Sequence, residues 1–512
     1  MTETTVISRR KAFGAIAATG AAVASSQTPA NAQGAGGATI TLLLVNDIYK
    51  MSEDKGRGGF AKLSAVVKEE RAKGTPMLYF HAGDCFSPSL MSGFDQGEHI
   101  VELTNFAPPD VFVPGNHEFD FGKDNYFKRH AQSKFPYFAA NMRQADGSPA
   151  PGHKDNAMFE KGGFKIGVFG VVLPYTAQLS SPGDLKFLPT MDTVKAQAKL
   201  LRDAGADLVV CCAHTDREED NAILRSRLVD VLLTGHDHDL AVAFDGKAVM
   251  VESNEEGNYI TAIDLSMSAR TGSDGKRAVT WSPSFRIHDS KNVTPDPETL
   301  AAVKKYEAEL SKELDVDIGV TAEPLDTTTL SVRTRETAIG NLFADAIKAS
   351  TGADVAIVNG GGIRGNKQYP AGQKLTRRDI LVELPFGNVT AMVELKGSDL
   401  KAALENGVSL YEARAGRFAQ VSGMKYEVDP KAPVGQRVTS VTVGDQPLDP
   451  NKNYKVAINE FILAGGDGYT SLGKGKVLIG LTDGKLMANE VMVYVRKLGT
   501  VTSKVEGRII IK

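Results

Sequence analysis

The amino-acid sequence predicts a two-domain α/β protein, and three observations carry this prediction. Short strand-like apolar runs alternate with helical patterns between residues 39 and 267, which is typical of a layered α/β domain. Residues 298–314 then form a charged helical pattern with few large apolar side chains, as expected of a helix between two domains. A second α/β region follows it, in a chain of 512 residues that is too long for one hydrophobic core.

The domain boundaries follow from these patterns. We predict an export signal over residues 1–32, a first α/β domain over 38–294, a linker helix over 295–315 and a smaller α/β domain over 316–512. In the first domain the predicted strands are 39–45, 77–80, 111–113, 166–173, 208–212, 231–234, 247–252 and 260–267. In the second domain a helix over 339–350, stopped by Gly352, precedes a strand over 355–358.

The bulk composition excludes several classes of protein. Hydrophobic residues make up 42% and charged residues 24%, as in an ordinary globular protein. A net charge of −3 gives no basic field for a nucleic-acid polymer or a membrane surface. No apolar run is long enough for a spanning helix. The three cysteines, Cys85, Cys211 and Cys212, provide neither a disulfide framework nor a CxxC zinc site.

The amino terminus has the features of a targeting segment. Arg9 and Arg10 precede a weakly hydrophobic stretch of small residues, and residues 30–32 (Ala-Asn-Ala) fit a signal-peptidase site. The arginine pair resembles a twin-arginine export signal, although Phe13 falls one place later than that pattern prefers, which leaves an ordinary secretory signal open. The sequence therefore predicts a periplasmic or secreted protein.

The stretch 113–120 is the centre of the predicted active site. Pro114 and Gly115 end a strand-like run, so Asn116, His117 and Asp120 would lie beyond the carboxyl end of a strand, where open α/β sheets place their chemistry. An amide oxygen, an imidazole and a carboxylate within five residues suit a metal-assisted attack on phosphate. Alone, the stretch could also be an ordinary polar turn.

Further loops that follow strand-like runs carry additional candidate metal ligands. The complete set is Asp47, Asp84, Asn116, His214, His236 and His238. Carboxylates mixed with imidazoles suit Zn²⁺, Mn²⁺, Fe or Co better than Ca²⁺. Two-metal sites hold their ions roughly 3.5–4 Å apart and need a bridging carboxylate. Asp84 is the obvious candidate for that bridge.

These motifs resemble those of the calcineurin-like metallophosphoesterases, over nearly the whole first domain. The resemblance implies a four-layer sandwich and two divalent ions of the Zn, Mn or Co type, with a metal-bridging water as nucleophile. It assigns one ion to Asp47, Asp84 and His238, and the other to Asp84, Asn116, His214 and His236. It also implies that His117 and Asp120 form the dyad that stabilises the transition state.

The first motif departs from the family pattern. The family usually has Asp-x-His, whereas this chain has Tyr49 two residues after Asp47. Tyrosine is a poor ligand for most divalent metals at neutral pH, so the first metal would be weaker or held differently, or Tyr49 would only face the substrate. His81, three residues before Asp84, is a candidate replacement ligand; the alternative is that His81 packs or hydrogen-bonds behind the ligands.

The second domain contains a set of residues that would suit a nucleotide. Three consecutive glycines, 360–362, let backbone amides approach an anion, and Arg364 adds a fork of donors. Phe386 and Phe461 stand beside flexible glycine turns. The region resembles the carboxy-terminal domain of the 5′-nucleotidase family. The resemblance places the base between Phe386 and Phe461, the ribose hydroxyls on Asp467, and the sugar and anionic end on Arg333, Asn359 and Arg364.

The sequence thus predicts a metal-dependent phosphatase that hydrolyses nucleoside 5′-monophosphates to nucleoside and phosphate. Enzymatic alternatives are a 2′,3′-cyclic-nucleotide phosphodiesterase, a nucleotide-sugar hydrolase and, less compatible with the nucleotide pocket, a sulfur-compound hydrolase. An alternative from another class is a nucleotide-binding protein whose metal site has degenerated, with Tyr49 as the first loss. No nucleic-acid polymer and no membrane segment in the mature chain are expected as part of its function.

Overall fold

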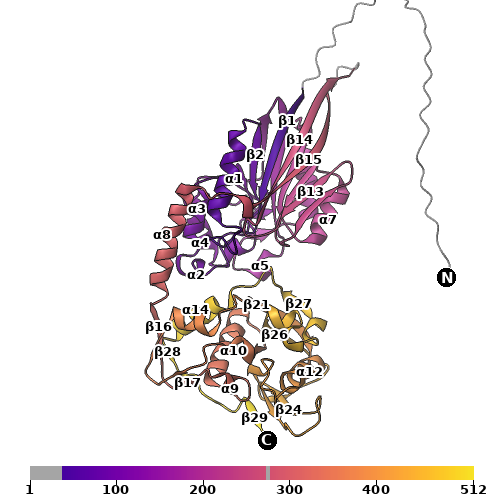
Figure 1. The fold of residues 1–512 in the computed structure, drawn as a ribbon. Helices are drawn as coiled ribbons and strands as arrows, with labels where there is room; N and C mark the ends of the chain where they lie inside the picture. Colours follow the sequence, from indigo (N-terminus) through magenta and orange to yellow (C-terminus); the bar gives the residue numbers. More distant parts are fainter. Residues whose placement is uncertain (1–36, 273–276) are drawn as a thin grey trace, which may run out of the picture.

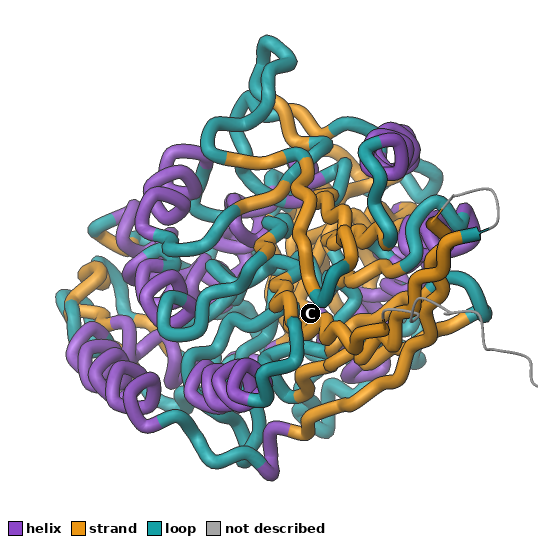
Figure 2. The backbone as a smooth tube through the Cα atoms, turned by 90° about the horizontal axis from the view of Figure 1, so that it is seen from above, coloured by secondary structure: helices purple, strands orange, loops and turns teal. Residues whose placement is uncertain are grey.

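The computed structural model describes residues 37–272 and 277–512, so the predicted export signal lies outside the described residues. Two α/β domains follow one another along the chain, and helix α8 (Pro297–Glu313) runs along one side of the molecule from the first to the second (Figure 1). Seen from above, the helices lie mainly around the strands (Figure 2). The predicted two-domain α/β fold is confirmed. None of the described helices is long and apolar enough to cross a membrane.

The first domain is a sandwich of two mixed sheets. The first sheet has the order β15 (Arg277–Asp289), β14 (Tyr259–Thr271), β1 (Gly37–Val45), β2 (Met77–His81), β3 (Val111–Phe112), β4 (Tyr137–Phe138) and β6 (His153–Lys154). The second has the order β12 (Leu240–Phe244), β13 (Val249–Ser253), β11 (Val231–Thr234), β10 (Leu208–His214), β8 (Phe164–Val172) and β7 (Asn156–Lys161). The sequence analysis had not predicted β15, which pairs with β14 along its whole length.

Strands β1 to β4 pair in parallel, with Leu42 opposite Leu78 and Phe80 opposite Val111. These strands are continuous apolar runs because both faces of a covered parallel sheet are buried. One core cluster joins the sheets and contains side chains of each, such as Leu42 and Val210. Helices α1 (Phe60–Ala72), α3 (Glu98–Thr104), α4 (Lys123–Gln132), α6 (Thr190–Asp203) and α7 (Arg217–Ser226) complete the domain.

The second domain is built on a five-stranded sheet. Its order is β22 (Ala419–Ser422), β18 (Val355–Asn359), β26 (Asn453–Asn459), β21 (Thr390–Lys396) and β27 (Lys476–Ile479). Smaller sheets have the orders β25 (Gln446–Pro447), β24 (Val438–Val443), β23 (Met424–Val428), β29 (Ile509–Ile511), and β20 (Lys374–Thr376), β16 (Asp317–Thr321), β28 (Thr500–Val501). The helices α10 (Ala338–Thr351), α11 (Arg377–Glu383), α12 (Gly397–Val408) and α14 (Met487–Leu498) pack on them.

Local sequence signals explain where the helices begin and end. Helix α8 starts with Asp296, whose side chain accepts a hydrogen bond from Thr299 N at 2.9 Å, followed by a proline in the first turn. Helix α10 starts at the cap residue Thr337 and ends at Gly352, which adopts φ +66° as a left-handed cap. The α10 boundaries match the predicted helix over 339–350 closely.

The linker helix α8 does more than bridge the domains. Val303 and Tyr306 are buried, and the helix packs against α1 and α3 of the first domain. The Tyr306 hydroxyl donates a hydrogen bond to Glu102 Oε2 at 2.5 Å. The few apolar residues of the predicted linker helix therefore fasten it to the first domain.

Candidate active site

The predicted metal ligands lie beyond the carboxyl ends of strands from both sheets. The set is Asp47 after β1, Asp84 after β2, Asn116 after β3, His214 at the end of β10, and His236 and His238 after β11. Because β1, β2 and β3 are parallel in one sheet and β10 and β11 in the other, their ends meet at one edge of the sandwich. The fold therefore gathers residues that are up to 191 positions apart (47 and 238).

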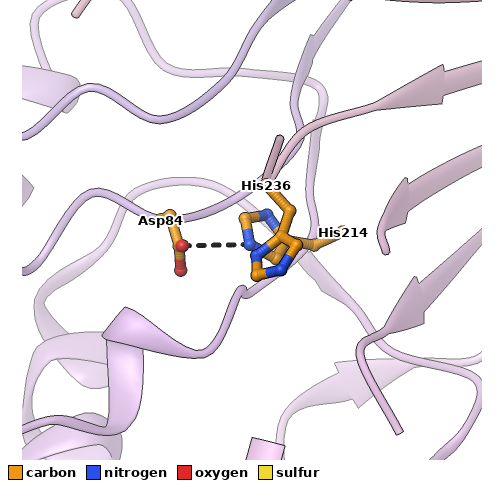
Figure 3. A group of neighbouring side chains, drawn as sticks. All are labelled: Asp84, His214 and His236. Atoms are coloured by element: carbon orange, nitrogen blue, oxygen red, sulfur yellow. Dashed lines mark ion pairs between the residues drawn. The ribbon is translucent and has the colours of Figure 1, made fainter. Parts of the chain in front are cut away.

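Three of these residues form a compact buried group (Figure 3). One ligand atom from each of Asp84, His214 and His236 lies within 4.8 Å of the others. His214 Nδ1 donates to the carbonyl of Ala82 at 2.7 Å, which leaves Nε2 facing Asp84 Oδ2 at 3.0 Å. This hydrogen bond from the far ring nitrogen is how proteins orient a metal-binding histidine.

The unpaired polar atoms of this group match a cation. Within the described part of the chain, His236 Nδ1 and both polar side-chain atoms of Asn116 are buried without a hydrogen-bond partner, and Asp84 Oδ2 and His214 Nε2 have only their ion pair with each other. Buried polar atoms are nearly always paired, since leaving one unpaired costs about 1–3 kcal/mol. These residues are the ones that the family resemblance assigns to the second metal, and their donor atoms fit a divalent ion.

The backbone around the ligands is strained. Asp47, Asp84, His236 and His238 all have positive φ, between +51° and +94°, where side chains other than glycine are uncommon. Gly115 allows the close approach of the loops, because a Cβ there would lie 2.1 Å from Asp84 Oδ1. Such strain is concentrated at functional sites, where the surrounding fold enforces it.

The first metal position is arranged differently from the second. Asp47 Oδ1 lies 3.4 Å from His238 Nε2, and the buried Tyr49 hydroxyl lies 3.1 Å from the first and 2.9 Å from the second. Burial opposes charge on His238, yet Asp47 raises its pKa to about 11. Tyr49 therefore points at the predicted ligands rather than at open solvent.

Glu118 is a positioning residue that the sequence analysis had not assigned to the site. Its buried carboxylate accepts hydrogen bonds from the backbone N–H groups of Asp84, Cys85, Phe86 and Gly115, at 2.6 to 3.1 Å. One side chain thus fixes the loops after β2 and β3 to each other. Its place in the Asn-His-Glu run was visible in the sequence, but its backbone partners were not.

His117 and Asp120 form a buried ion pair. His117 Nδ1 lies 2.7 Å from Asp120 Oδ2, and Ser180 donates to the other oxygen of Asp120 at 2.8 Å. His117 Nε2 lies 2.6 Å from the carbonyl of Thr482. Both partners of the ring are acceptors, so both nitrogens carry protons. Burial disfavours this cation, but Asp120 outweighs it and raises the pKa of His117 to about 10.

His81 contacts the loop behind the ligands. Its Nδ1 accepts a hydrogen bond from Gly83 N at 3.2 Å, and its ring packs on Phe112 with centroids 4.9 Å apart. Burial lowers the pKa of His81 to about 3, so the ring is neutral. Through Nδ1 His81 holds the Asp84 loop from behind, while its Nε2 is buried without a hydrogen-bond partner, so both alternatives for His81 stay predictions.

The six predicted substrate residues line one cavity of about 390 Å³ in the second domain. They are Arg333, Asn359, Arg364, Phe386, Phe461 and Asp467. The two phenylalanines are 59% and 45% exposed, which is unusual for side chains of this size and leaves their rings free for a ligand. The Arg364 guanidinium lies 5.4 Å from the centre of the Phe386 ring.

A hydrogen-bond chain orients the polar side of this cavity. Asn459 donates to Asn359 Oδ1 at 3.0 Å, and Asn359 donates to Asp467 Oδ2 at 2.8 Å. Asp467 stands at φ +54° within a glycine-rich turn. The sequence analysis named Asn359 and Asp467 but had no signal for Asn459, which is 100 positions from Asn359 in the sequence.

The part of the second domain that contacts the metal centre is not the part that forms the nucleotide cavity. Besides the Thr482 carbonyl on His117, Asp483 lies 3.7 Å from His236 Nε2, and Lys485 lies 3.7 Å from Asp120 Oδ1. These residues belong to the turn between β27 and α14, and none of them lines the nucleotide cavity. Figure 1 shows β27 and α14 on the side of the second domain that faces the first.

Comparisons with known proteins agree with both halves of this arrangement. The model of the calcineurin-like phosphoesterases matches residues 40–240, and that of the 5′-nucleotidase C-terminal domain matches residues 317–474. The chain is therefore a metallophosphoesterase in class, and it belongs to the 5′-nucleotidase family of hydrolases.

Individual relatives align along almost the full chain. A snake venom 5′-nucleotidase of Crotalus adamanteus is 29% identical over 93% of this chain and 89% of its own. The crystal structure of a 5′-nucleotidase precursor from Thermus thermophilus is 27% identical, covers 92% of this chain and 99% of that chain, and superposes with a TM-score of 0.52. The NAD nucleotidase of Haemophilus influenzae, 21% identical over 93% of this chain and 99% of that chain, shares the fold with a TM-score of 0.78.

Proposed function

We propose that this protein hydrolyses nucleoside 5′-monophosphates to nucleoside and phosphate. The observation that carries the proposal is the single cavity lined by all six predicted nucleotide-binding residues, in the same chain as a metallophosphoesterase centre. Two exposed phenylalanine rings suit a base, and the Asp467 carboxylate suits the ribose hydroxyls. The relative from Crotalus adamanteus carries the name 5′-nucleotidase, which supports the same substrate class.

The chain's own residues divide the work of the reaction. Two divalent ions held by the six ligands supply charge neutralisation and water activation when bound. His117, kept positively charged by Asp120, offers a buried proton donor for the phosphoryl oxygens or the leaving group. Glu118 fixes the loops that carry Asp84 and Asn116, so that these donors are pre-oriented.

The nucleotide cavity contributes binding energy far from phosphorus. Contacts to base and ribose can position the phosphate against the metal centre. Because the 482–485 turn contacts His117 and lies beside His236, the second domain has to move before a nucleotide held in the cavity can meet these residues. Helix α8, fastened to the first domain by Val303 and Tyr306, leaves the residues after Glu313 to act as the hinge.

The predicted location is outside the cytoplasm. Residues 1–32 resemble an export signal, and the matched relative is a venom protein. We propose that the mature chain acts on extracellular nucleotides in the periplasm or the medium. Fractionation of cells that express the full chain tests this: the mature chain is expected outside the inner membrane, and retention of the uncleaved chain in the cytoplasm contradicts it.

Phosphate release from AMP tests the proposed reaction. Mature protein is stripped with chelator and resupplied with Mn²⁺, Co²⁺ or Zn²⁺ in turn, and metal-restored release is expected. A panel of a 2′,3′-cyclic nucleotide, a nucleotide sugar and NAD then identifies the preferred ester. AMP binding without release by any metal would replace this proposal with that of a nucleotide-binding protein.

A further inference from the structure

Three ligand-type atoms converge at the first metal position. Asp47 Oδ1, the Tyr49 hydroxyl oxygen and His238 Nε2 are 2.9, 3.1 and 3.4 Å apart in pairs. Ligands at bonds of about 2.0–2.2 Å to one ion lie about 2.8–3.1 Å from each other in octahedral geometry and about 3.3–3.6 Å in tetrahedral geometry. The triangle formed by these atoms therefore has the dimensions of one face of a metal coordination shell.

The other contacts of His238 and Asp47 turn the remaining atoms toward Tyr49. His238 Nδ1 lies 3.1 Å from the Glu255 carboxylate, which is the partner that a metal-binding histidine commonly has behind it. Asp47 Oδ2 accepts from Asn46 Nδ2 at 2.7 Å and from His236 N at 2.9 Å. These partners leave His238 Nε2 and Asp47 Oδ1 facing the Tyr49 hydroxyl, which donates a hydrogen bond to Oδ1 at 3.1 Å and lies 2.9 Å from Nε2.

The position of Tyr49 is fixed by its backbone. Tyr49 N and Lys50 N donate to Glu256 Oε2 at 3.0 and 2.8 Å, and Glu256 N donates to the carbonyl of Asp47 at 2.7 Å. The side chain is 4% exposed, and its ring meets the His117 ring edge-on with centroids 5.8 Å apart. The backbone hydrogen bonds and the burial of the ring thus fix the hydroxyl beside Asp47 and His238.

We propose that Tyr49 is a ligand of the first metal, through its phenolic oxygen, at the place where the family's first motif has histidine. This inference rests on the two-metal centre of the proposed function. On metal binding the Tyr49 O–H bond, which donates to Asp47 Oδ1, would break; the oxygen would keep the electron pair as a metal donor and the proton would pass to solvent. Asp47 and Tyr49 would then supply two oxygens beside the imidazole of His238, a harder donor set than the Asp-x-His pair of the family.

Metal content and absorbance of three forms of the mature chain test this role. Chelator-stripped protein is loaded with Fe³⁺, Mn²⁺ or Zn²⁺, and bound metal is counted by elemental analysis after desalting. Wild type is expected to hold two ions per chain and, with Fe³⁺, to show a visible phenolate-to-iron absorption band. Tyr49→Phe is expected to hold one ion without the band, and Tyr49→His to regain the second ion, also without the band.

A matched control shows whether the loss of metal is specific to the Tyr49 hydroxyl or follows the removal of any tyrosine hydroxyl. The Tyr175 hydroxyl donates to Asp216 at 2.6 Å and contacts none of the predicted ligands, so Tyr175→Phe is expected to keep both ions and the band. Circular dichroism confirms that each variant is folded.

Two outcomes overturn the inference. Equal metal content and affinity in Tyr49→Phe and wild type mean that the hydroxyl does not bind the ion. If wild type holds one ion but Tyr49→His holds two, the Tyr49 hydroxyl excludes the first metal by hydrogen bonding to its ligands. Phosphate release from AMP is measured separately on the same samples: an iron–phenolate band without release upholds Tyr49 as a ligand and rejects the proposed reaction.

Discussion

The metal centre and the nucleotide cavity differ in how tightly the fold determines them. Five of the six predicted ligands are buried, the side chain of His238 is 18% exposed, and four of the six stand at positive φ. In the cavity, by contrast, Phe386 and Phe461 are about half exposed and Asp467 alone of the six residues has positive φ. Chemistry at phosphorus needs donors held within fractions of an ångström, whereas base stacking tolerates a freer ring.

This difference predicts that substitutions in the two regions impair different properties of the protein. Substitutions in the metal centre should abolish activity or unfold the ligand loops, because the buried ligand atoms have no alternative partners. Changes in the cavity should weaken substrate binding and leave the fold intact. Four variants, from the largest expected effect to the smallest, test this contrast.

Asp84→Asn is expected to have the largest effect on the rate. Asp84 is the predicted bridge, so its loss should lower kcat for AMP by on the order of 10³-fold and reduce the bound metal below that of wild type. Steady-state kinetics and elemental analysis measure the two effects. Asp239→Asn is the control, since that carboxylate is 64% exposed and pairs with Arg217. A rate in Asp84→Asn close to that of the control would reject the assignment.

Glu118→Gln is expected to be the most destabilising variant. The amide places an N–H₂ group against two of the four backbone donors, which costs about 1–3 kcal/mol for each donor left unpaired, or about 2–6 kcal/mol in total. Denaturant unfolding measures the loss. Glu405→Gln makes the same change at a carboxylate that accepts from Arg437 N and Val438 N in the second domain. It should destabilise that domain without lowering metal content.

Phe461→Ala is expected to affect binding alone. Loss of one stacking surface costs about 1–3 kcal/mol, which corresponds to about a 5- to 150-fold rise in KM for AMP. Because the ring is 45% exposed, the melting temperature and the metal content should stay close to those of wild type. Leu481→Ala, which removes a 60% exposed side chain outside the cavity, is the comparison variant. An unchanged KM in Phe461→Ala would remove this ring from the proposed base site.

Lys485→Ala is expected to have the smallest effect. Its ammonium lies 3.7 Å from Asp120 and the side chain is 34% exposed, so the pair should contribute less than about 1 kcal/mol to the contact between the domains. We expect a change in kcat of less than about fivefold and no change in metal content. A loss of kcat as large as that of Asp84→Asn would show that Lys485 takes part in the reaction and does not only pair with Asp120 between the domains.

Local chemistry explains why the sequence alone revealed so much of this protein. Continuous apolar runs identified the parallel strands, and Pro114 and Gly115 marked the end of β3 and so the start of the loop that carries Asn116. Cap residues located the helices, as at Gly352. Each of these signals lies within a few residues of the feature that it predicts, because hydrogen-bond capping and backbone sterics act locally.

Only the tertiary structure decided how distant residues meet. Three contacts show this: Glu118 with the backbone of Asp84, 34 positions away, Asn459 with Asn359, 100 positions away, and Thr482 with His117, 365 positions away. The orientation of Tyr49 belongs to the same group, because Asp47 alone is near it in sequence while His238 is 189 positions away. Contacts of this kind depend on how sheets and domains pack, and a pattern of neighbouring residues carries no record of that packing.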